Sequence, residues 1–97
     1  MGEVSRETKK LYTAILKLKS LQEAEKFFRD LLTLPEIGEF SKRFQIAKLL
    51  WQNAGSYETI AKKLKVSTTT VTRVAHWLNH GRGGYRLILE RLFGAQK

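Results

Sequence analysis

The chain of 97 residues has no cysteine, a single proline, and no apolar run near the length that would cross a membrane. Without cysteine, disulfide bonds, thiolate metal sites and cysteine nucleophiles are all excluded. The opening segment "MGEVSRETKK" lacks the apolar core of a signal peptide. We therefore expect a cytoplasmic protein that has no membrane partner.

Acidic side chains are also scarce. Nine Asp and Glu residues stand against 18 Lys and Arg residues, which gives a formal net charge of +9. The imbalance lies mainly in the second half, because residues 1–48 carry ten basic and seven acidic groups and residues 49–97 carry eight and two. Such charge is typical of a polyanion binder, since each neutralised phosphate releases a counterion. It is also compatible with a basic surface that only keeps the protein in solution.

Apolar residues recur at helical spacing throughout, and no segment has the alternating pattern of a strand. The spacing predicts helices over about residues 5–18, 35–53, 57–64, 68–79 and 85–93, and a further helix after Ser20. Ser20 and Glu23 form a predicted capping box, and Pro35 stands near a helix start, where proline is tolerated. Gly55 is expected to end the third helix in a left-handed conformation, and "GRGG" (81–84) to form a turn or hinge. We predict one all-α domain of about six helices over residues 1–97.

The predicted third helix, residues 35–53, is apolar on two sides. One stripe runs from Ile37 to Trp51, and a second contains Ile46 and Leu50. A helix with two apolar faces must be covered on both. The chain's own helices are one source of cover, but small helical domains often gain core by association. We therefore predict that residues 5–53 form the dimerisation helices of a homodimer.

Residues 56–79, "SYETIAKKLKVSTTTVTRVAHWLN", have the pattern of a helix-turn-helix. Ala61 is small enough for the close crossing of the two helices. Ser67 is a predicted N-cap. Lys65 occupies the turn position where glycine usually permits a positive φ, and a left-handed lysine there would cost about 1 kcal/mol. Aliphatic side chains occupy the positions expected to pack: Ile60, Leu64, Val66, Val71 and Val74.

If Val71 and Val74 pack inward, the polar face of the second helix must point to solvent. Threonine offers a hydroxyl group to base edges or phosphates and a methyl group to thymine. A merely solvated helix would more often use Glu, Lys or Ala than a row of threonines. The sequence thus predicts a double-stranded DNA partner. The predicted contacts are Lys62, Lys63, Lys65, Ser67, Thr68, Thr69, Thr70, Thr72, Arg73 and His76.

Two segments, "LLTLPEIGEFSKRFQIAKLL" and "VSTTTVTRV", resemble the central and recognition helices of the Trp repressor family. The resemblance runs without a gap from about Leu31 to Leu92 and is closest to the Trp-repressor-like branch called YerC/YecD. It implies an intertwined, all-helical homodimer that binds operator DNA and regulates transcription, most simply as a repressor.

The resemblance also implies a ligand pocket. In the family, tryptophan is held by a threonine and two arginines, which correspond to Thr33, Arg43 and Arg73. The glycine and the serine that leave room for the indole are replaced by Val74 and Trp77. We expect these two side chains to fill the pocket themselves, so that tryptophan does not bind.

Other kinds of site have little support. His76 and His80 have the spacing of a metal-binding pair, but no third ligand is near, so no metal is predicted. No catalytic constellation can be assembled, so neither enzyme activity nor a cofactor is predicted. Three interpretations remain: a dimeric, sequence-specific DNA-binding regulator, a basic helical module for RNA or protein, and a sensor of an effector smaller than tryptophan, held by Arg43 and Arg73. For Arg43 and Arg73, an ordinary surface role or an ion pair with Glu36 or Glu39 is equally open.

Overall fold

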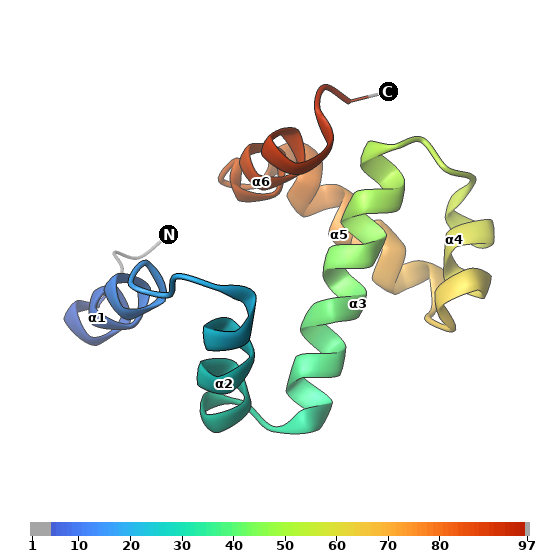
Figure 1. The fold of residues 1–97 in the computed structure, drawn as a ribbon. Helices are drawn as coiled ribbons and strands as arrows, with labels where there is room; N and C mark the ends of the chain where they lie inside the picture. Colours follow the sequence, from blue (N-terminus) through green and yellow to red (C-terminus); the bar gives the residue numbers. More distant parts are fainter. Residues whose placement is uncertain (1–4, 97) are drawn as a thin grey trace. The chain divides into compact units, whose positions relative to one another are not determined.

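The computed structural model describes residues 5–96, and the regular secondary structure of these residues is helical throughout (Figure 1). The described helices are α1 (Arg6–Ile15), α2 (Leu21–Leu31), α3 (Leu34–Trp51), α4 (Tyr57–Leu64), α5 (Thr68–His80) and α6 (Gly84–Phe93). The prediction of an all-α fold with about six helices is confirmed. The main difference is that α1 ends at Ile15 rather than at residue 18, because the amides of Lys17 and Leu18 bond to carbonyls three residues back, as in a turn.

Hydroxyl groups begin most of these helices. Three helices start after a serine that accepts a hydrogen bond from the amide of a threonine three residues later, at 3.1 Å in each case: Ser5, Ser56 and Ser67. Ser20 does the same for the amide of Glu23, also at 3.1 Å. The Glu23 carboxylate accepts in return from the amide of Lys19, one residue before the expected partner, at 2.9 Å. The predicted capping box is therefore present, with its second bond displaced by one residue.

The described chain divides into two compact units, one ending at Ile37 and the other beginning at Gly38. In the described part of the first unit no side chain is buried, although α1 and α2 both carry apolar faces. Leu16 and Leu21 are 82% and 77% exposed. The first unit therefore has no core of its own. The prediction that residues 1–97 form one domain stays a prediction.

The second unit contains a core shared by α4, α5, α6 and the C-terminal half of α3. Its fully buried side chains include Ile46 of α3, Ile60 of α4, Val71 of α5 and Leu89 of α6. The Trp51 indole N–H donates to the Gly94 carbonyl at 2.9 Å, which fastens the end of α6 to α3. This core holds the predicted helix-turn-helix in place (Figure 1).

One prediction about glycine is wrong and another is one residue too long. The left-handed residue that ends α3 is Asn53, with φ 53°, and Gly55 follows in another conformation, with φ 136°. Asparagine tolerates the left-handed region because its short polar side chain bonds locally, so it supplies the cap that we assigned to glycine. Gly84 is already the first residue of α6, so the turn after α5 is shorter than the predicted "GRGG" segment.

Candidate nucleic-acid interface

Helices α4 and α5 pack against each other as the sequence predicted. Ala61 and Ile60 of α4 are buried, at 5% and 1% exposure, and so are Val71 and Val74 of α5, at 0% and 4%. The small side chain of Ala61 permits the close crossing, and the valines bind α5 to the core. The opposite side of α5 is consequently turned to solvent.

The turn between the two helices is a Schellman motif. The Val66 amide donates to the Ala61 carbonyl at 3.0 Å, and the Lys65 amide donates to the Lys62 carbonyl at 3.3 Å. Lys65 occupies the left-handed position, with φ 58° and ψ 46°. Lys65 therefore adopts the left-handed conformation for which this turn position usually has glycine.

The row of hydroxyl groups at the start of α5 divides into two sets. The Ser67 hydroxyl accepts from the Thr70 amide at 3.1 Å and lies 3.0 Å from the Thr70 hydroxyl, and the Thr72 hydroxyl donates to the Thr68 carbonyl at 2.9 Å. These three hydroxyls serve the helix itself. The side chains of Thr68 and Thr69 are exposed, and their hydroxyls make no hydrogen bond to the described residues.

The exposed side of the helix-turn-helix is basic. The side chains of Lys62, Lys63, Lys65, Arg73 and His76 are all exposed. Each of α1 to α4 has an acidic residue in its first turn, whereas α5 has none anywhere in its sequence. Because the N-terminus of a helix carries a partial positive charge, the absence of a carboxylate leaves that charge available to an anion.

The residues predicted to hold a ligand do not all belong to one unit. Thr33 belongs to the first unit and Arg43 and Arg73 to the second. The Thr33 hydroxyl accepts from the Glu36 amide at 3.2 Å, and the Glu36 carboxylate accepts from the Thr33 amide at 2.9 Å and from the Thr33 hydroxyl at 3.0 Å. Thr33 is thus the cap of α3. The sequence contained this signal, because Thr33-x-x-Glu36 repeats the pattern that identified the capping box at Ser20.

Hydrogen bonds from Thr33, first from its amide and then from its hydroxyl, lower the pKa of the Glu36 carboxyl group. Arg43 forms its ion pair with Glu39, and its guanidinium lies 5.5 Å from the centre of the Phe40 ring. Of the two partners left open for Arg43, the structure therefore selects Glu39. Tyr85, which the sequence reasoning did not single out, also lies within the influence of Arg43: burial raises the pKa of its phenol and the arginine opposes that shift.

Val74 and Trp77 have different surroundings. Val74 is 4% exposed and belongs to the core, whereas Trp77 is 53% exposed. The Trp77 and His76 rings have centres 5.4 Å apart and planes at 79°. The centre of the His80 ring is also 5.4 Å from that of His76. That Val74 and Trp77 fill a ligand pocket therefore stays a prediction. No group of three or more potential metal ligands occurs among residues 5–96.

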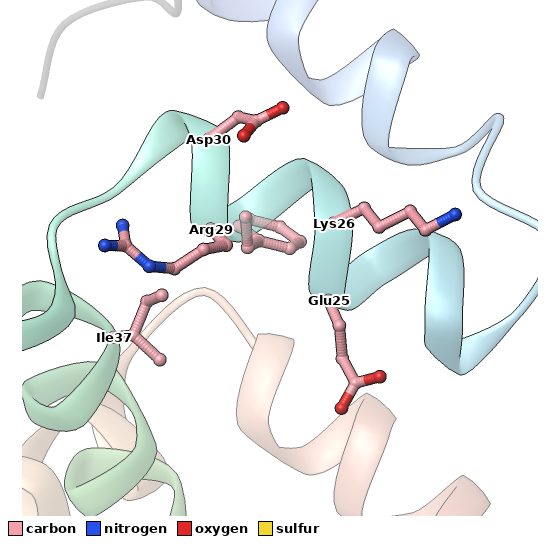
Figure 2. A pocket seen from close by; sticks show the side chains of 6 residues that line it. Glu25, Lys26, Arg29, Asp30 and Ile37 are labelled. Carbon is pink, nitrogen blue, oxygen red and sulfur yellow. The ribbon is translucent and has the colours of Figure 1, made fainter.

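An open pocket lies along α2 in the first unit, apart from these residues (Figure 2). Phe28 and Ile37 give it an apolar lining, and four charged residues surround them: Glu25, Lys26, Arg29 and Asp30. Figure 2 shows the charged ends of these four residues pointing in different directions. Small-molecule sites usually direct a few polar groups toward one point, so this pocket lacks the convergence that such a ligand needs.

None of the described helices is long and apolar enough to cross a membrane.

Comparison with known proteins gives consistent matches over nearly the whole chain. The family model for Trp repressor protein matches residues 6–93. A Bacillus subtilis (strain 168) protein named "Uncharacterized protein YerC" is 36% identical over 87 residues, which cover 90% of this chain and 83% of that protein. The crystal structure of a TrpR-like protein from Eubacterium eligens superposes with a TM-score of 0.86 at 42% identity, and covers 96% of this chain and 95% of the other.

Proposed function

This chain belongs to the Trp repressor family, in its YerC-like branch, and we propose that it is a sequence-specific DNA-binding regulator of transcription that acts as a homodimer. The family is one of regulators rather than enzymes. One observation carries the proposal: α5 is held by buried Val71 and Val74 and exposes Thr69 and Arg73 on its other side. A helix presented in this way fits the major groove, where the threonines meet base edges and the lysines of α4 meet phosphates.

The homodimer is supported by the apolar surface of the first unit. Side chains of α1 and α2 that would form a core have no cover within residues 5–37, and the pocket in Figure 2 adds an apolar surface beside them. A second copy of the chain offers matching surfaces by symmetry. Two recognition helices related by a twofold axis would read two half-sites about 34 Å apart, one turn of the duplex.

We further propose that DNA binding does not depend on tryptophan. Buried Val74 leaves no open space at its position on α5, and the Arg43 guanidinium already pairs with the Glu39 carboxylate. Isothermal titration of the protein with L-tryptophan should give no heat of binding. Micromolar affinity would refute this part of the proposal.

Selection of bound fragments from genomic DNA, followed by footprinting, tests the main proposal. The expected result is a pseudo-palindromic site with protected half-sites about one helical turn apart. Affinity that is the same for the selected duplex and for a random duplex at physiological salt would contradict sequence-specific binding. That result would favour the alternative in which the basic helices serve RNA or a protein.

A further inference from the structure

Two helices of the second unit end in the same motif but with different residues at its left-handed position. At the end of α3, the Ala54 amide donates to the Leu49 carbonyl at 2.9 Å and the Asn53 amide to the Leu50 carbonyl at 3.1 Å. The amides of Val66 and Lys65 make the equivalent pair of bonds at the end of α4. The left-handed residue is Asn53 in the first motif and Lys65 in the second.

Lysine is the unusual choice. Glycine adopts a positive φ without strain and asparagine does so with little, whereas the Cβ of a lysine is crowded by the backbone. Among residues 5–96, Asn53 and Lys65 are the non-glycine residues with positive φ. Nothing in the turn requires a side chain at residue 65, because the motif is closed by backbone bonds alone.

The described part of the fold does not use the Lys65 side chain. It is exposed, and the ion pair and the cation–π contacts seen in the structure involve other residues. A strained residue whose side chain serves no internal purpose suggests a role toward a partner. The charge and the neighbours of Lys65 identify the chemistry of that partner. Lys62 and Lys63 precede it in the chain, and the free hydroxyls of Thr68 and Thr69 follow three and four residues later. Four residues span at most about 14 Å, so all these groups lie within reach of one stretch of phosphate backbone.

We infer that Lys65 is a phosphate-anchoring residue, kept at the expense of folding stability because its ammonium group binds a backbone phosphodiester of the DNA. This inference rests on the proposed DNA-binding function and deepens it. The Schellman motif fixes the backbone on both sides of Lys65, so its Cα–Cβ bond has one direction relative to α5. Its phosphate contact would therefore help set the register of α5 on the duplex, beyond adding charge.

Four variants test the inference: Lys65→Gly, Lys65→Asn, Lys65→Arg and, as the matched control, Asn53→Gly. Thermal unfolding and DNA binding at several salt concentrations are measured for each, with the selected duplex and with a random duplex of equal length. Lys65→Gly should raise the melting temperature by about 2–6 °C. It should also weaken binding to both duplexes roughly 5- to 10-fold at low salt and lower the salt slope by about 0.9. Lys65→Asn should weaken binding in the same way.

The controls separate the two effects. Lys65→Arg should keep the wild-type salt slope, because it keeps the charge. Asn53→Gly relaxes the equivalent position at the end of α3 and should leave DNA binding unchanged. If the wild-type chain binds DNA and Lys65→Gly and Lys65→Asn bind it with the same affinity and salt slope, the inference is overturned while the proposed function stands. If the wild-type chain binds neither duplex, both fail.

Discussion

The hydroxyl groups at the start of α5 are chemically alike but differ in what they can do for a partner. The Ser67 hydroxyl bonds to the Thr70 hydroxyl and accepts from the Thr70 amide, whereas Thr69 is exposed and its hydroxyl makes no hydrogen bond to the described residues. Thr69→Ala should therefore change the preferred base at one position of the site, at a loss of about 1–3 kcal/mol for the selected duplex. Binding to a panel of duplexes that differ at single positions measures this.

Two variants serve as controls for Thr69→Ala. Ser67→Ala removes the N-cap and should lower the free energy of unfolding by about 1 kcal/mol. Thr69→Ala should leave the free energy of unfolding unchanged. Lys62→Ala should weaken all duplexes about equally and reduce the salt slope, because a phosphate contact carries no sequence information. Equal losses of Thr69→Ala on selected and random duplexes would contradict the assignment of Thr69 to base readout.

Residues whose roles depend on local geometry could be predicted from the sequence. The left-handed Lys65, the Ser67 cap and the buried valines all follow from spacing within a few residues. Arg43 was left open between Glu36 and Glu39, and the structure selects the partner four residues away, which faces it on the helix. Trp77 could not be placed, since the cover of a half-exposed indole depends on surfaces distant in sequence or on another chain.

At the scale of the element, the start of α3 depends on a charged cap. The two hydrogen bonds from Thr33 lower the pKa of Glu36, and a carboxyl group with a lower pKa in the folded state stabilises the fold above its ordinary pKa. That contribution is lost as the pH falls through the lowered value. Glu36→Gln should reduce the melting temperature by about a degree or two at pH 7. The difference from wild type should shrink on acidification below the ordinary carboxyl range, and a difference that stays constant with pH would contradict the charged cap.

Two glycines in the connection from α5 to α6 differ in whether a side chain could be accommodated. A Cβ atom on Gly81 would lie 2.3 Å from the Trp77 carbonyl oxygen, whereas a Cβ on Gly84 would meet nothing within 4 Å. Gly81→Ala should therefore destabilise the fold by about 1–3 kcal/mol, since the end of α5 would have to move. Gly84→Ala, its matched control, should stabilise it by about 0.5 kcal/mol. Chemical denaturation measures both, and equal effects would show that the turn does not approach α5 closely at Gly81.

This turn also shows how far patterns predict elements. The glycines correctly marked a break between helices, but four adjacent residues could not indicate which glycine would already be helical. The sequence was ambiguous at the end of α3 too, because both Asn53 and Gly55 suit a left-handed cap. The position of the last helical hydrogen bonds decides that Asn53 is the cap. Apolar spacing therefore predicts where the helices occur. The residue at which each helix ends depends on hydrogen bonds that the spacing does not specify.

At the scale of the whole molecule, the first unit has apolar faces that it does not cover by itself. Its helices have strongly apolar faces, yet Leu16 and Leu21 are 82% and 77% exposed. Exposed leucines on successive helices are unfavourable in water, and the free energy of covering them is a driving force for association. The sequence argument for a partner came from the two apolar sides of residues 35–53, so it did not single out the exposed leucines of α1 and α2.

Leu21→Glu tests the proposed homodimer directly. Leu21 is the first residue of α2, where a carboxylate favours the helix, so in a single chain this change should be harmless. In a dimer that buries Leu21, an unpaired charge at the interface should raise the dissociation constant at least about 100-fold. Sedimentation should then show the mass of one chain for Leu21→Glu and of two chains for the wild type.

Gln22→Glu is the matched control, since it adds the same charge one residue further along the polar side of α2. Gln22→Glu should leave the dimer intact. The melting temperatures of the wild type and of Gln22→Glu should both rise with protein concentration, as they do when folding and association are coupled. A wild-type chain that sediments as a single copy at micromolar concentration would contradict the dimer. The dimer would also be contradicted if Leu21→Glu and Gln22→Glu sedimented with the same mass, because that result would show that Leu21 is not buried against a second chain.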